Sequence, residues 1–195
     1  MNDTDCLYYY YEKTCEPFRT ITSLPFEEAL IVYRAWRADN PNSGVTTPEW
    51  YLKRRYEMEK TVRSKFIAIG GKPIHTAPVY FTLGKNKGME TWYNNPACIK
   101  IPINEFDLNT VSFTYGDMFP VFNPTLNTGE EWWEQVYNYD SILRLINKHG
   151  FPEDPEYNMK KCIFPKDKNI GCYLKYVEAH VWDDAILNKY HIAME

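Results

Sequence analysis

The first third of the chain repeats apolar residues at spacings of three and four, which places their side chains on one face of a helix. One stripe begins after Pro25, a residue that suits the first turn of a helix, and consists of Phe26, Ala29, Leu30, Tyr33 and Trp36. A second stripe follows Thr47 and Pro48, an N-cap and first-turn pair, and ends at two consecutive glycines. Its members are Leu52, Tyr56, Glu59, Val62, Phe66 and Ile69. The pattern predicts two early helices.

Later segments change toward the two-residue period that is typical of β-strands. Strands are predicted over residues 7–12, 79–83, 98–103, 111–115, 133–139 and 173–182. In the first of them, Tyr8 and Tyr10 point to one face and Tyr9 and Tyr11 to the other, so we expect this strand to be covered on both faces. Pro102, near the end of its strand, indicates an edge position.

The order of the elements indicates the fold class. One short later helix is predicted over residues 141–149, between Asp140 as its cap and Gly150 at its end, and residues 151–171 are expected to form a long loop. Two helices followed mainly by strands favour an α+β fold with a mainly antiparallel sheet. The 195 residues contain no internal repeat or linker, and domains average roughly 150 residues. Residues 1–195 are therefore expected to form a single domain.

Charge and hydropathy narrow the choice of partner and location. Lysine and arginine number 22 against 26 aspartates and glutamates, which gives a net charge of −4. A chain-wide positive field is therefore absent, and this argues against a nucleic-acid partner. No apolar run approaches the ~20 residues that cross a bilayer, and the N-terminus lacks the basic and apolar regions of a signal peptide. We expect a cytoplasmic location without membrane association.

The cysteines and histidines form no metal-binding motif. The five cysteines include no C-x-x-C pair, and an odd number without a signal peptide favours free thiols. No two of the four histidines stand at metal-ligand spacing along the chain. No metal is therefore expected, although His75 lies in a proline-bounded loop just before a predicted strand.

Glu178 and His180 stand two residues apart on the last predicted strand, so alternation places both on one face, beside Tyr176 and Trp182. An acid and an imidazole are unexpected on a face that is purely core, because burying a charge is unfavourable. Two interpretations remain open. Either this is an edge strand with a solvated polar face, or Glu178 is the acid of a site and His180 is a hydrogen-bonding neighbour.

Ser112 and Thr114 also share one face of their predicted strand. Facing a pocket, the two hydroxyls would hydrogen-bond a ribose or a carboxamide, whereas facing water they would bind nothing. Arg19, which follows the first predicted strand, offers a planar fork of donors that suits a phosphate or carboxylate. A surface salt bridge is the alternative interpretation of Arg19.

Several blocks of the chain resemble a group of small bacterial proteins to which no function is assigned. These blocks are residues 7–13 (LYYYYEK), 70–73 (GGKP), 112–117 (SFTYGD) and 176–182 (YVEAHVW). The order of elements also resembles ADP-ribosyltransferase-like folds, in which a first strand, a hydroxyl-bearing middle strand and a late-strand glutamate hold NAD. The chain departs from those folds in three ways. Its first strand has no histidine or arginine, it has no Ser-Thr-Ser sequence, and Glu178-Ala179-His180 replaces the usual Glu-x-Glu or Gln-x-Glu.

The resemblance implies that Tyr8 or Tyr10 contacts NAD, that Ser112 or Thr114 helps hold it, and that Glu178 is catalytic. The leading hypothesis is an NAD- or nucleotide-binding domain and, if it is an enzyme, an ADP-ribosyl transferase. Glu178 would hydrogen-bond a ribose hydroxyl and stabilise developing positive charge, while the tyrosine face of the first strand would stack on a base. The alternative is a non-enzymatic interaction module whose surplus tyrosines and tryptophans, 16 and 6 in number, form a protein-binding patch.

Overall fold

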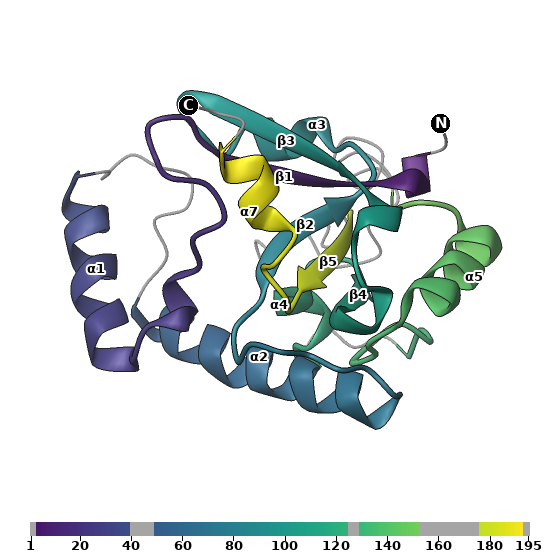
Figure 1. The fold of residues 1–195 in the computed structure, drawn as a ribbon. Helices are drawn as coiled ribbons and strands as arrows, with labels where there is room; N and C mark the ends of the chain where they lie inside the picture. The colour runs from purple at the N-terminus through teal and green to yellow at the C-terminus, as the bar shows by residue number, and fades with distance from the viewer. Residues whose placement is uncertain (1–2, 40–48, 125–128, 153–175, 193–195) are drawn as a thin grey trace.

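A five-stranded antiparallel sheet organises the described part of the chain, in the order β3-β1-β2-β5-β4 (Figure 1). The computed structural model describes residues 3–39, 49–124, 129–152 and 176–192. The strands are β1 (Cys6–Glu12), β2 (Val79–Leu83), β3 (Pro96–Pro102), β4 (Val111–Tyr115) and β5 (Val177–Val181). The predicted α+β class with an antiparallel sheet is confirmed, and β3 occupies an edge, as Pro102 indicated.

Helices flank the sheet on both sides. They are α1 (Phe26–Asp39), α2 (Glu49–Ala68), α3 (Lys87–Glu90), α4 (Met118–Val121), α5 (Tyr139–His149) and α7 (Leu187–Ile192). Figure 1 shows α1 at one end of the molecule, beside the start of α2, and α5 at the other. The two predicted early helices are confirmed, while the proposed cap Thr47 lies outside the described residues. Helix α2 ends as expected, because Gly70 adopts a φ of +95° and the Gly71 amide donates to Phe66 O over 2.9 Å.

Odd-numbered residues of the strands form the apolar face of the sheet. They make up most of one hydrophobic core: Leu7, Tyr9, Tyr11, Val79, Phe81, Leu83, Val111, Phe113, Tyr115, Val177, Ala179 and Val181. Helix α5 adds Ile142, Leu145 and Ile146 to this core, and α7 adds Leu187. Tyr9 and Tyr11 are buried because they lie on this face, where they pack in the same core.

Even-numbered residues of β1, β2, β4 and β5 point to the opposite side, which we call the polar face. Helix α2 covers it with Met58, Val62 and Phe66, which pack against Trp182 and Tyr80. Helix α1 does not share this core, because it packs on the first half of α2 in a separate cluster. The sheet is therefore covered on both sides, with different chemistry on each.

One predicted strand, over residues 133–139, is wrong. Glu134 has a φ of +56°, a left-handed conformation that breaks an extended backbone, and residues 131–134 form a turn. Only Tyr137 pairs with the sheet, through an isolated bridge to Phe113. The next helix is confirmed, but Asn138 rather than Asp140 caps it, its side chain accepting from Ser141 N over 3.0 Å. Residues 153–171 of the predicted loop and 173–175 of the last predicted strand lie outside the described residues.

Candidate functional site

The register of the sheet places polar side chains in two rows across the polar face. Each row takes one residue from each of three neighbouring strands, because antiparallel partners on the same face stand side by side. The rows are Thr82–Glu178–Thr114 and Tyr80–His180–Ser112. Ser112, Thr114 and His180 are fully buried, and Glu178 is 5% exposed. The face therefore concentrates polar groups where water does not reach them.

Glu178 lies in the interior of the sheet, because β5 runs between β2 and β4. The interpretation of a solvated edge strand is therefore wrong. One carboxylate oxygen, Oε2, accepts a hydrogen bond of 3.0 Å from the Met118 amide at the start of α4. Asp117 caps that short helix, accepting from Phe119 N over 2.8 Å. The turn at residues 116–117 thus aims a backbone donor at the buried acid.

His180 and Ser112 form a hydrogen-bonded pair in the row next to that of Glu178. His180 Nδ1 lies 3.1 Å from Ser112 Oγ, which also accepts a 2.9 Å bond from Trp182 Nε1. An indole nitrogen only donates, so the serine proton remains available for Nδ1. The other ring nitrogen, Nε2, lies on the side of Glu178.

The other nitrogen of His180 has no hydrogen-bond partner among the described residues. Nε2 is buried and lies 3.2 Å from Glu178 Oε1, close enough for attraction but without the alignment of a hydrogen bond. An unpaired buried polar atom is destabilising by about 1–3 kcal/mol. This unsatisfied atom beside a buried carboxylate calls for an explanation, because native structures contain few such atoms.

Helix α2 contributes a second buried acid to this face. Glu59 is 3% exposed, and its Oε1 accepts bonds from Tyr80 OH at 2.5 Å and from Arg55 Nε at 3.0 Å. The Arg55 guanidinium stacks over the Tyr80 ring, 4.4 Å from its centroid. Burial raises the pKa of Tyr80 well above its ordinary value, and the Glu59 charge adds to the rise. Tyr80 in turn lies edge-on to His180, with ring centroids 5.6 Å apart.

Two further tyrosines lie near the Glu178 carboxylate. Tyr51 stacks on Phe119 with ring centroids 4.0 Å apart and an angle of 3° between the planes. The Tyr176 hydroxyl donates to Asp117 over 3.1 Å. Burial raises the pKa of both tyrosines, with the charges of Asp117 and Glu178 as further causes. Each of these rings therefore stays neutral, and the acid is surrounded by aromatic groups.

Most of the predicted site residues share this face. Tyr8 is paired with Thr82 and so continues the row that contains Glu178, and Lys100 Nζ lies 5.7 Å from the centre of its ring. Tyr10 is buried on the same face, where its hydroxyl accepts a 2.8 Å bond from Asn86 N. The hydroxyl of Thr114 already donates to Gly116 O over 2.7 Å, so it supports the turn before α4.

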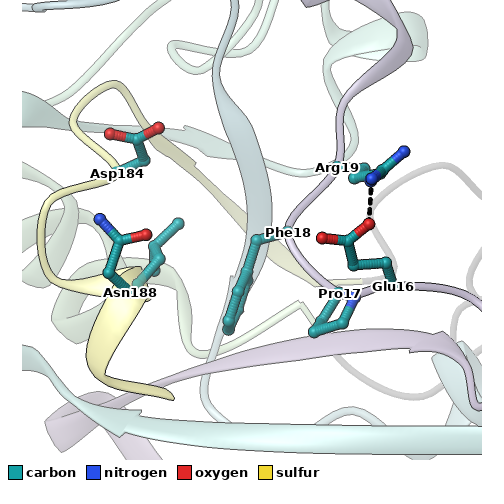
Figure 2. Close-up of a pocket in the computed structure, with 7 residues that line it drawn as sticks. Glu16, Pro17, Phe18, Arg19, Asp184 and Asn188 are labelled. Atoms are coloured by element: carbon teal, nitrogen blue, oxygen red, sulfur yellow. Dashed lines mark ion pairs between the residues drawn. The ribbon is translucent and has the colours of Figure 1, made fainter. Parts of the chain in front are cut away.

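Arg19 does not join the other predicted residues. Its side chain is 76% exposed and forms a surface ion pair with Glu16, as the alternative interpretation held. Figure 2 shows this pair on one wall of an open hollow of about 480 Å³, with Asp184 and Asn188 opposite. Phe18 lies between the two walls and adopts a φ of +62°, which is unusual for a bulky residue. Phe18 and Leu187 also pack against the apolar face, so the hollow is separate from the polar face.

The histidine spacing along the chain missed one possible metal site. His75, Asp183 and Asp184 each offer a ligand atom, and these atoms lie within 4.8 Å of one another. The sequence also gave little sign of Tyr80, Tyr51 and Arg55 as neighbours of the site. For Glu59 a signal did exist, since a glutamate stands within an apolar helical stripe.

Comparisons with protein-family models, with curated proteins and with solved structures find no match to this chain. Among the described helices, none combines the length and the apolar character that a membrane span requires.

Proposed function

We propose that the chain binds a nucleotide, NAD in the first instance, on the polar face and uses Glu178 in ADP-ribosyl transfer. In this reaction the bond between ribose C1′ and the nicotinamide nitrogen breaks, and nicotinamide leaves with the electron pair. An acceptor amine, hydroxyl or water then bonds to C1′ and releases a proton. The Glu178 carboxylate stabilises the positive charge that develops on the ribose.

The observation that carries this proposal is the unpaired Nε2 of His180 next to the carboxylate of Glu178. A ribose hydroxyl both donates and accepts a hydrogen bond. It would therefore satisfy both groups at once, by donating to Glu178 and accepting from His180. A buried nitrogen without a hydrogen-bond partner beside a buried carboxylate calls for an explanation, and a catalytic role supplies one.

The row that contains Glu178 supports a ligand of nucleotide length. Tyr8 stands two strands from Glu178 in the same row, which is about 10 Å at the usual strand spacing of about 4.8 Å. The ring of Tyr8 offers a surface for a base, and Lys100 beside it offers a positive charge for a phosphate. Because Glu178 is only 5% exposed, binding requires the surrounding rings, Tyr51 and Tyr176 among them, to rearrange.

Two other functions receive less support. Ser112, His180 and Glu178 contain the groups of a hydrolase triad, but Ser112 is fully buried and its oxygen already accepts a bond from Trp182. An interaction module with an aromatic surface patch fits poorly as well. Among the described residues, the exposed large hydrophobic side chains are Ile31, Val32, Trp50, Ile67, Ile69 and Ile74, and only one of these is aromatic.

Glu178→Gln tests the proposal, because glutamine keeps the size of the side chain and an acceptor for Met118 N but removes the charge. We expect the wild-type protein to release nicotinamide from NAD, and the variant to do so about 10²- to 10³-fold more slowly. NAD should still raise the melting temperature of the variant, since binding contributes stability whether or not the reaction proceeds.

Glu90→Gln is the matched control, because the Glu90 side chain is 42% exposed and its ion pair with Lys85, the one it forms within the described part of the chain, spans 4.0 Å. It should release nicotinamide at the wild-type rate. Equal turnover by Glu178→Gln and Glu90→Gln would contradict the role of Glu178. Failure of NAD and of other nucleotides to shift the wild-type melting temperature would contradict nucleotide binding and leave the interaction module as the better hypothesis.

A further inference from the structure

A second group of chemically active side chains lies where two strands meet. His75 precedes β2, and Asp183 and Asp184 follow β5. His75 and Asp184 are in contact although they are 109 residues apart along the chain. Since β2 and β5 are antiparallel neighbours with Val79 opposite Val181, these two connections emerge at the same end of the sheet. There His75 Nε2 lies 3.0 Å from Asp184 Oδ1.

Contacts outside the group hold its backbone in place. The His75 amide donates to Trp182 O over 2.8 Å, which ties the two connections together. Arg63, from α2, donates to the carbonyls of His75 and Pro73 over 2.9 and 3.0 Å. Asp183 is oriented as well, because its Oδ1 accepts a 3.0 Å bond from Ala185 N. The three side chains therefore extend from a fixed backbone, and those of His75 and Asp184 are exposed to solvent.

The charges of this group are not balanced. Two adjacent carboxylates face one imidazole, and in the described part of the chain neither carboxylate is paired with a lysine or arginine. Arg63 directs its donors to backbone carbonyls instead. A cation at this place would offset both negative charges, and it would replace the 3.0 Å contact between His75 Nε2 and Asp184 Oδ1.

We propose that His75, Asp183 and Asp184 bind a divalent transition-metal ion of the Zn²⁺ type. One imidazole nitrogen with two carboxylate oxygens is a donor set that zinc accepts, at about 2.0–2.2 Å from each ligand atom. Ligands at that distance stand about 3.4 Å apart in a tetrahedron. The three ligand atoms already lie within 4.8 Å of one another, and the exposed side chains can turn to close the remainder.

The site would have an open coordination position beside the hollow of Figure 2. Asp184 is both a ligand and a wall of that hollow. Three protein ligands leave at least one position of a zinc ion for water or for an oxygen of a small molecule, an arrangement found in catalytic rather than structural zinc sites. The site does not depend on the polar face, so its test needs no nucleotide.

A Co²⁺ titration of the full chain tests the proposal, with Co²⁺ as a spectroscopic substitute for Zn²⁺. We expect one equivalent to bind, with visible absorption that added Zn²⁺ abolishes. Thiols also bind these metals, and Cys15 and Cys98 are exposed. The absence of the intense near-ultraviolet band of cobalt bound to thiolate will distinguish His75, Asp183 and Asp184 from a cysteine site.

His75→Gln and Asp184→Asn should each weaken Co²⁺ binding at least 10- to 100-fold. Loss of a residue that only hydrogen-bonds a metal ligand already lowers metal affinity by about that factor, and here a ligand itself is removed. Their melting temperatures without metal should stay near that of the wild type, since both side chains are exposed. His149→Gln, which alters a histidine paired with Glu131, should bind Co²⁺ normally. The absence of saturable binding at millimolar Co²⁺, a thiolate band, or equal affinity in all three variants would overturn the proposal.

Discussion

The two faces of the sheet bury their side chains equally well but by different means. On the apolar face, Val111, Phe113 and Val177 meet other hydrocarbon groups and need no particular partner. On the polar face, His180 and Glu178 require specific donors and acceptors, and one atom of His180 finds none. Apolar packing accounts for most of the first face, where the indole nitrogen of Trp132 is the buried atom that has no hydrogen-bond partner in the described part of the chain. The second face instead buries an acid and an imidazole together, which packing alone would not favour. The difference is the main reason to look for function on the polar face.

The largest effect is expected on the apolar face. Phe113→Ala removes a fully buried ring from the centre of that core and should lower the free energy of unfolding by about 3–5 kcal/mol. Urea denaturation followed by circular dichroism measures the change. A loss below about 1 kcal/mol would show that the apolar face is less tightly packed than the structure indicates.

A smaller but sharper effect is expected on the polar face. Ser112→Ala removes a single oxygen and leaves His180 Nδ1 and Trp182 Nε1 without a partner, so it should destabilise by about 2 kcal/mol. Ser64→Ala is the control, because that hydroxyl is exposed and only bonds Lys60 O in its own helix. If both variants unfold at the same urea concentration, the buried hydrogen bonds contribute little and the contrast between the faces is lost.

The smallest effect is the response of the polar face to alkali. Burial raises the pKa of Tyr80 in the folded state above its ordinary value of 10.0, so the folded protein keeps a proton that the unfolded chain releases. The resulting stability is present below pH 10 and is lost as the pH rises toward the folded pKa. Tyr80→Phe should therefore reduce the alkaline loss, by up to about 1.4 kcal/mol per pH unit. Urea denaturation at several values above pH 10 measures both slopes, and parallel slopes would contradict a raised pKa.

Much of this contrast follows from the sequence. The period of two along residues 79–83 and 111–115 predicts both strands with their observed bounds, and it separates the apolar set from the set that contains Ser112 and Thr114. The spacing of Glu178 and His180 likewise predicts that they share a face. Local alternation is sufficient for these statements because it depends only on backbone geometry.

The contacts between elements could not be predicted in the same way. Which strand lies beside β5 depends on the strand order, and that order brings Tyr80 next to His180 and His75 next to Asp184. Residues 133–139 show a different failure, since the two-residue period predicted a strand there but the left-handed Glu134 interrupts the extended backbone.

The edge strand β3 has a consequence for how copies of the chain meet one another. The outermost strand of an open sheet exposes unpaired backbone groups that can recruit a strand from another molecule. In β3 a proline stands at each end, Pro96 and Pro102, and neither has an amide proton to offer. Lys100 places a positive charge between them, so two such edges would repel each other on approach. At the opposite edge, the bridge to Tyr137 occupies the backbone groups of Phe113 in the middle of β4, so another strand would find fewer free partners there as well.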